Sequence, residues 1–219
     1  MKNLTAYGIL LTILIVAGGL ACQTQKPSSG ANNSSAVDHS AHDMSNMNVH
    51  DMSNMGHDTS APGAAEQPYD LQFIDSMMHH HDGAIQMAEM ALRKTAREEL
   101  KKFAQKIIDD QKKENARMET WRDQWYAGKP SAMNIELPGM KMGSMSPDHG
   151  KLMEAMQGKD FDIHFIDMMI PHHEGAVKMS RELLQKGEHA ELKTMANEII
   201  REQEAEIKQM QAWKAEWSK

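Results

Sequence analysis

Apolar residues recur every third or fourth position along much of the chain, which is the spacing of helices with one buried face. The longest such stripe lies in residues 103–125 and consists of Phe103, Ile107, Gln111, Glu114, Met118, Trp121 and Trp125. Residues 195–217 repeat this stripe, and residues 73–91 keep the same helical spacing. The pattern therefore predicts long amphipathic helices and an all-α protein.

An internal duplication accounts for most of the chain. Residues 69–125 align with residues 161–217 without a gap when the sequence is shifted by 92 positions. The matched pairs include Asp70 and Asp162, His80 and His172, His81 and His173, Gly83 and Gly175, and Met87 and Met179. We expect a helical hairpin in residues 69–126 and a second in residues 161–219, with Gly187 in the turn of the second.

The two hairpins are expected to pack on each other, because one hairpin alone cannot bury both of its apolar stripes. Residues 127–160 join them, and this connection is too long for a tight turn. A long middle connection is used as the crossover in ferritin-like arrangements. We therefore expect a ferritin-like four-helix bundle made of two duplicated helical hairpins.

The start of the chain has the pattern of an export signal. Lys2 precedes an uncharged, mostly apolar run over residues 7–21, shorter than the roughly 20 apolar residues of a spanning helix. Small residues precede Cys22, as in the lipobox of bacterial lipoproteins, so we expect a signal peptide in residues 1–21 and lipidation of Cys22. Plain secretion and an uncleaved anchor are the alternatives. Each interpretation places the rest of the chain outside the cytoplasm. We expect a lipoprotein of the bacterial cell envelope, either periplasmic or anchored to the outer membrane.

Residues 22–68 contain few large aliphatic side chains, so burial could not offset the entropy lost on ordering them. We expect a disordered tether. Within it the segment His42-Asp43-Met44-Ser45-Asn46-Met47 recurs at residues 50–55. The candidate metal ligands of the tether are His39, His42, Met44, Met47, His50, Met52, Met55 and His57. The alternative is a low-complexity linker whose Met and His residues arose by repeat slippage.

The amino-acid composition limits the kinds of metal site that the chain can form. The 219 residues include 21 Met and 12 His but one Cys, which excludes an intramolecular disulfide and multi-cysteine zinc or iron–sulfur sites. Soft, neutral thioethers favour Cu(I) or Ag(I), and imidazole also accepts Cu(II). A net charge of −7 without a long Lys/Arg run argues against nucleic-acid binding. Because the sequence lacks the Glu-x-x-His pairs of a di-iron oxidase and any nucleophile or phosphate-loop motif, we expect no catalysis.

Each repeat carries a methionine one helical turn before a pair of histidines. Met77 lies three and four residues before His80 and His81, so its sulfur can reach either ring. The equivalent residues of the second repeat are Met169, His172 and His173. This spacing predicts half of a soft-metal site in each repeat. The alternative is that one histidine of each pair is a hydrogen-bonded core residue and the other is solvated.

Further residues extend these candidate sites. Met87 and Met179 share the face of His80 and His172 but lie about 10 Å along the helix, so we expect core packing or a separate site. Gly83 and Gly175 remove side-chain bulk beside the histidines, which lets another helix approach.

Four polar residues interrupt the apolar stripes, and they are Gln111, Glu114, Gln203 and Glu206. A buried carboxylate must be paired, hydrogen-bonded or metal-bound. We interpret Glu114 and Glu206 as partners that orient the histidine rings, with a position at the edge of the bundle as the alternative. Asp75 and Asp167 either contact a ring in the same way or cap local structure.

The connection between the repeats is also rich in methionine. Met140, Met142 and Met145 have the spacing of a sulfur-only Cu(I) site. Met is also an adaptable packing residue, and packing is the alternative. Pro138-Gly139 and Ser146-Pro147 argue against a continuous helix here.

One sequence motif resembles a known family. Gly158-Lys159-Asp160-Phe161-Asp162, followed by Phe165 and by Met168-Met169-Ile170-Pro171-His172-His173-Glu174-Gly175-Ala176, is similar to the motif of the family called domain of unknown function 305. The first repeat carries a second copy of the motif, with His79 in place of Pro171. The resemblance covers two tandem copies, roughly residues 69–217. It implies a ferritin-like helical fold and, as in some periplasmic members, copper binding and copper tolerance.

These observations together predict an extracytoplasmic protein that sequesters or transfers Cu(I) or Cu(II), with Cu(I) preferred and Ag(I) as a mimic. Its expected partners are copper ions, the membrane through Cys22, and a copper-export or copper-oxidase protein. The alternative is a non-metal interaction or structural lipoprotein of the same fold, which would leave the Met and His residues of the tether without a purpose.

Overall fold

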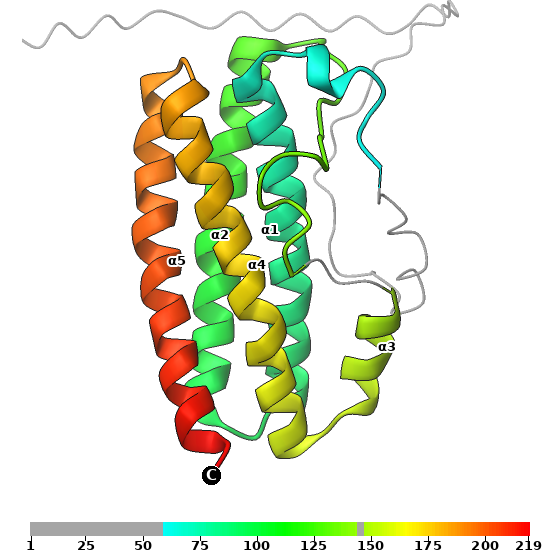
Figure 1. Ribbon diagram of the computed structural model, residues 1–219, viewed down its shortest axis with the longest axis vertical. Coiled ribbons are helices and arrows are strands. Elements are labelled where there is room, and N and C mark those ends of the chain that lie inside the picture. The colour runs from blue at the N-terminus through cyan, green and yellow to red at the C-terminus, as the bar shows by residue number, and fades with distance from the viewer. Residues whose placement is uncertain (1–58, 144–146) are drawn as a thin grey trace, which may run out of the picture. The chain divides into compact units, whose positions relative to one another are not determined.

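The computed structural model describes residues 59–143 and 147–219, and this part of the chain is helical without strands. The 3-10 helix η3 (Ala64–Glu66) precedes α1 (Tyr69–Lys94), α2 (Glu98–Tyr126), α3 (Pro147–Ala155), α4 (Gly158–Lys186) and α5 (Ala190–Trp217) (Figure 1). The predicted all-α fold is confirmed. The predicted signal peptide, Cys22, Met145 and the Met/His repeats of the tether lie outside the described residues. None of the described helices is both long enough and apolar enough to cross a bilayer.

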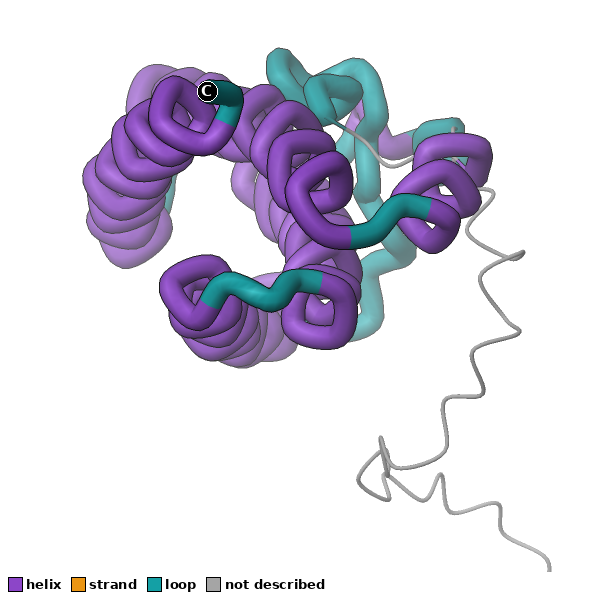
Figure 2. The backbone as a smooth tube through the Cα atoms, turned by 90° about the horizontal axis from the view of Figure 1, so that it is seen from below, coloured by secondary structure: helices purple, strands orange, loops and turns teal. Residues whose placement is uncertain are grey.

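The four long helices form a bundle of two hairpins. Residues 95–97 join α1 to α2, residues 187–189 join α4 to α5, and α1 also packs along α4. Figure 1 shows that α2 ends and α4 begins at opposite ends of the bundle. The connection between them therefore has to travel the length of the bundle, as the ferritin-like crossover does. In the view along the helices, the long helices surround a common axis (Figure 2).

The folded part of the chain begins earlier than the sequence predicted. Ala61 donates its backbone N–H to the carbonyl of Met133 at 2.8 Å, and Ser60 Oγ donates to Asn134 Oδ1 at 3.1 Å. Ala64 in η3 is buried. The tether was expected to extend to residue 68 because this segment lacks large apolar residues, but polar contacts with the connection hold it instead.

Equivalent contacts close the two ends of the bundle. Asp70, at the start of α1, accepts the backbone N–H groups of Glu188 and His189 in the α4–α5 turn at 3.0 and 2.9 Å. Asp162, at the start of α4, accepts from Arg97 Nε in the α1–α2 turn at 3.1 Å. Each hairpin therefore holds the turn of the other.

Tryptophans cover both of these turns. Trp125 stacks on His189 with ring centroids 3.8 Å apart, and the Arg97 guanidinium lies 4.3 Å from the centre of the Trp217 ring. Arg97 and His189 are 92 positions apart, as are Trp125 and Trp217. The duplicated sequence thus produces the same arrangement at both ends.

The core consists of two hydrophobic clusters separated by a polar layer. The Phe73 cluster includes Phe73, Ile74, Met77, Met118, Met140, Met179, Leu183 and Met195, whereas the Phe161 cluster includes Met87, Phe103, Ile107, Phe161, Phe165, Met169, Met210 and Trp217. Between them lie eight buried polar residues: His80, His81, Gln111, Glu114, His172, His173, Gln203 and Glu206. These eight are four pairs of equivalent residues, one member from each repeat.

We expect Asp70→Ala to lower the free energy of unfolding by about 2–4 kcal/mol, because two backbone N–H groups lose a buried acceptor. Urea denaturation followed by helical circular dichroism measures the change. Glu119→Ala, at an exposed position of α2, is the control and should shift the value by no more than about 0.5 kcal/mol. Equal denaturation midpoints for the two variants would contradict the role assigned to Asp70.

Candidate metal centre

One histidine from each repeat meets at the interface between α1 and α4. The ring centroids of His80 and His172 lie 3.7 Å apart, with an angle of 36° between the ring planes. Both residues are buried, with exposed fractions of 4% and 2%. The sequence left open whether the two histidine pairs form separate sites, and the structure brings them together.

Two glycines make this contact possible. A Cβ atom on Gly175 would lie 3.1 Å from His80 Nε2, and a Cβ atom on Gly83 would lie 3.3 Å from His172 Nε2. Each glycine therefore leaves room for the imidazole of the opposite repeat. The sequence predicted that these glycines permit a close approach. The structure shows that His80 approaches Gly175 and that His172 approaches Gly83.

The second histidine of each pair contacts a glutamate on the neighbouring helix of its own hairpin. His81 Nε2 lies 2.8 Å from Glu114 Oε2, and His173 Nε2 lies 2.8 Å from Glu206 Oε2. Both rings are fully buried, and both glutamates are largely buried. The contact expected between each glutamate and a ring is present, whereas its role in orienting a metal ligand remains a prediction.

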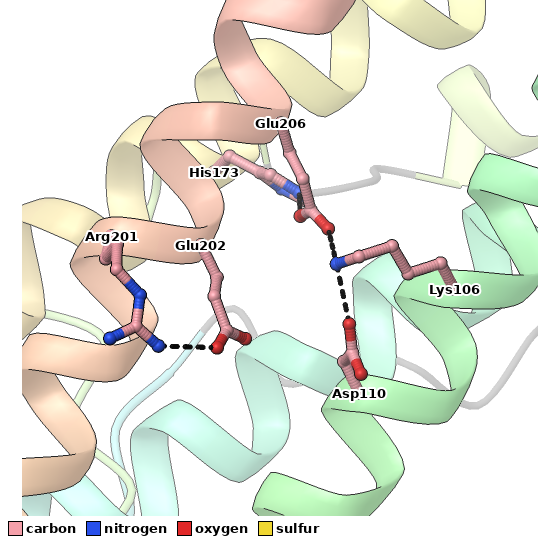
Figure 3. A network of polar contacts seen from close by, with 6 residues as sticks. All are labelled: Lys106, Asp110, His173, Arg201, Glu202 and Glu206. Atoms are coloured by element: carbon pink, nitrogen blue, oxygen red, sulfur yellow. Dashed lines mark hydrogen bonds and ion pairs between the residues drawn. The ribbon is translucent and has the colours of Figure 1, made fainter.

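The two glutamates differ in their other partners. Lys106 Nζ lies 2.8 Å from Glu206 Oε1 and 2.7 Å from Asp110 Oδ2 (Figure 3). Burial alone would raise the pKa of Glu206, but the contacts with His173 and Lys106 outweigh it and lower this pKa. Lys106 belongs to the first repeat, and the equivalent residue of the second repeat is an acid, Glu198, which pairs with Arg117 at 2.6 Å.

Grooves between α2 and α5 reach both glutamates. A groove of about 490 Å³ is lined in part by Glu206 and Lys106, and a second of about 230 Å³ is lined in part by Glu114. Figure 3 also shows the ion pair between Arg201 and Glu202 on α5, and both residues line each groove. The carboxylates that contact His81 and His173 are therefore the part of the polar layer nearest to solvent.

Several ring nitrogens of the polar layer lack hydrogen-bond partners. In the described part of the chain these include both nitrogens of His80 and the Nδ1 atoms of His81, His172 and His173. Burial and the neighbouring histidines lower the pKa of His80 and His172 well below 6.5. These two rings are therefore neutral near pH 7, and a neutral imidazole carries a lone pair that can bind a metal ion.

The nitrogen and carboxylate groups of the described residues do not form a cluster of three. Within residues 59–143 and 147–219, no three His, Cys, Asp or Glu side chains lie close enough together to form a metal site. The paired His80 and His172 are two candidate nitrogen ligands. Methionine is a further ligand type that suits Cu(I) and Ag(I).

The candidate methionines flank the histidine layer in a pattern that the sequence did not predict. Met77 of the first repeat and Met179 of the second share the Phe73 cluster, whereas Met87 and Met169 share the Phe161 cluster. All four side chains are fully buried. The helices α1 and α4 run in opposite directions (Figure 1). Equivalent methionines therefore lie on opposite sides of the histidines.

The connection between the repeats places two more methionines close to the bundle core or to α4. Met140 is buried in the Phe73 cluster, and Met142 is half-buried. A Cβ atom on Gly139 or Gly143 would collide with the α4 backbone at Gly175 or His172, so this loop lies directly on α4. The two glycines around Met140-Lys141-Met142 were the available sequence signal for this packing, but they do not identify the helix that is contacted.

For Asp75 and Asp167 the structure favours the structural alternative. Asp75 pairs with Arg122 at 2.6 Å and accepts the backbone N–H of Ala132 at 2.8 Å, which fastens the connection to α1. Asp167 pairs with Lys214 at 2.5 Å on the surface. Each of these two aspartates is bound to a cation of its own hairpin, and a role as a partner of a histidine ring stays a prediction.

The metal-free protein should lose stability as the pH falls below about 6.5. In the unfolded chain His80 and His172 take up protons near pH 6.5, whereas the folded state lowers their pKa and keeps them neutral. The unfolded state then binds more protons, so the free energy of unfolding drops by up to about 1.4 kcal/mol per pH unit for each histidine. Urea midpoints between pH 7.5 and pH 5.5 measure the slope. The double variant His80→Leu/His172→Leu should flatten it, and an unchanged slope would contradict the assignment.

Several solved structures are similar to this chain. The protein CopM, solved in a Cu(II)-bound form, is 43% identical over 68% of this chain and 97% of its own, with a TM-score of 0.58. The Cu(I)-bound form of CopM is 41% identical over 68% of this chain and 96% of its own, with a TM-score of 0.57. An Ag-bound form has also been solved. A putative secreted DUF305 protein from Streptomyces coelicolor is 26% identical over 69% of this chain and 93% of its own, with a TM-score of 0.64.

No curated protein matches the chain. The family model described as "Domain of unknown function (DUF305)" matches residues 70–214, a continuous segment that spans both hairpins. This match covers well over half of the chain, and it agrees with the resemblance seen in the histidine motifs. The chain belongs to the DUF305 family.

Proposed function

We propose that this protein binds copper outside the cytoplasm and holds it at one site shared by the two repeats, centred on His80 and His172. The observation that carries the proposal is the pair of neutral, buried imidazoles in contact, with three ring nitrogens that lack hydrogen-bond partners. Buried polar atoms without partners are costly, and metal binding would satisfy them. The Cu(II)-, Cu(I)- and Ag-bound forms of CopM support copper as the cargo.

The role proposed is sequestration or transfer of copper in copper tolerance, without catalysis. Imidazole accepts both copper oxidation states, and the surrounding methionines favour Cu(I). The His/Met repeats between His39 and His57 would collect ions, and lipidation at Cys22 would keep the protein at the membrane. A copper-export or copper-oxidase protein is the expected recipient.

A shared site predicts non-additive losses of copper. His80→Ala and His172→Ala should each remove about one copper ion per chain, and the double variant should remove no more than either single variant. Separate sites would instead make the losses add. Equilibrium dialysis of the full chain under anaerobic conditions measures the stoichiometry, and the tether contributes equally to every variant.

His164→Ala is the matched control, because His164 lies on α4 two turns before His172. It should leave the copper stoichiometry unchanged, and circular dichroism should show equal helicity in all variants. Unchanged copper binding in the double variant His80→Ala/His172→Ala would refute the shared site and favour a non-metal interaction protein.

The tether should bind Cu(I) without the bundle, because its ligands are close together in the sequence. A synthetic peptide of residues 39–57 should withdraw Cu(I) from a colorimetric chelator under anaerobic conditions. A peptide with every Met replaced by Leu is the control and should withdraw less. If the two peptides compete equally, the thioethers are not ligands, and the proposal for the bundle is unaffected.

A further inference from the structure

We propose that Met142 supplies a thioether ligand to the site of His80 and His172, so that the shared site selects Cu(I) and Ag(I) over divalent ions. This inference rests on the proposed function, since it adds a third ligand to the same site. It concerns a residue of the connection, outside both repeats. It also gives the site a ligand that the duplication by itself does not provide.

The position of Met142 is defined relative to Gly175. A Cβ atom on Gly175 would lie 3.1 Å from His80 Nε2 and 3.2 Å from Met142 Cβ. The imidazole nitrogen and the base of the methionine side chain are therefore neighbours at the same point on α4. A methionine side chain has three rotatable bonds, so its sulfur can turn from this position towards the ring.

The loop that carries Met142 is fixed on both sides. Met142 donates its backbone N–H to the carbonyl of Gly139 at 2.9 Å, which closes a tight turn. Gly139 packs on Gly175, and Gly143 packs on the backbone of His172. Both glycines have positive φ angles, 99° and 65°, which other residues rarely adopt. The turn therefore places Met142 beside the imidazole pair with little freedom for its backbone.

Other methionines are less suited to this role. Met77, Met140 and Met179 are buried in the Phe73 cluster, where their side chains fill the hydrophobic core. Met142 is half-buried and belongs to neither hydrophobic cluster. A half-buried thioether next to a buried imidazole can take an ion from solvent and pass it to the ring.

The sulfur breaks the symmetry of the site. Gly83 is the residue of the first repeat that is equivalent to Gly175. A Cβ atom on Gly83 would have His172 Nε2 within 4 Å but no atom of a methionine. The two imidazoles are thus related by the duplication. The loop of residues 139–143 is not, because it packs on α4 and has no counterpart on α1 at Gly83 among the described residues. One His₂Met site is expected rather than two equivalent ones.

The charge of the ion is the physical basis of the proposed selectivity. His80, His172 and Met142 are all neutral ligands, so the charge of a bound ion is not compensated within the set. Burying an uncompensated charge costs free energy that rises steeply with the charge, which disfavours divalent ions. The thioether is also a soft donor that binds Cu(I) and Ag(I) better than Zn(II).

The test uses the full chain with ¹³C-methyl methionine and ¹⁵N histidine, and Ag(I) and Zn(II) as redox-stable probes. Single substitutions assign the signals of Met142, His80 and His172. Ag(I) should shift the Met142 methyl signal together with both imidazole signals, whereas Zn(II) should not move the Met142 signal. Met142→Leu, which keeps the side-chain size but removes the sulfur, should weaken Ag(I) binding at the imidazoles by about tenfold or more.

Met133→Leu is the matched control, because Met133 lies in the same connection and packs on the Phe73 cluster. It should change the Ag(I) affinity of the imidazoles by less than about twofold. If Ag(I) shifts the imidazole signals but not that of Met142, or if the two Leu variants bind Ag(I) equally, Met142 is not a ligand while the proposed function stands. If the imidazole signals never respond to Ag(I), the proposed function fails together with this inference.

Discussion

Two imidazole rings occupy the interface between α1 and α4, and they fit there because each helix lacks a side chain opposite the ring of the other. Gly83 and Gly175 provide that space, although glycine within a helix costs roughly 0.5–1 kcal/mol relative to alanine. The same close approach divides the hydrophobic core into the Phe73 and Phe161 clusters. It also gives the connecting loop a smooth surface at Gly175 on which Gly139 can pack.

A buried polar layer in the middle of a helical bundle destabilises the fold unless each polar group has a hydrogen-bond or ion-pair partner. His81 and His173 have theirs in Glu114 and Glu206, whereas both nitrogens of His80 have none among the described residues. Each buried polar atom left without a partner costs about 1–3 kcal/mol. A ligand that binds the folded state alone would recover part of this cost and stabilise the bundle by mass action. The layer is thus easier to understand as a binding site than as a device for stability.

The sequence predicted those parts of the molecule that depend on periodicity. Helical spacing located the long helices, and the shift of 92 positions identified the histidines and glycines that prove to be in contact. It did not predict that Met77 groups with Met179 rather than Met169, because that grouping depends on the opposite directions of α1 and α4. Nor could it place the loop at residues 139–143, which touches α4 through backbone atoms and leaves no periodic signal.

The two repeats have kept their imidazoles and changed the charges around them. Glu206 shares its charge between His173 and Lys106, whereas no lysine or arginine within the described residues forms an ion pair with Glu114. The residue equivalent to Lys106 is acidic Glu198. The electrostatic potential near Glu114 therefore differs from that near Glu206. On the Glu206 side Lys106 is paired with both Glu206 and Asp110, whereas the groove at Glu114 is lined by Lys113 and Arg117 as well as by Glu198. The two glutamates therefore contact equivalent histidines in different electrostatic surroundings.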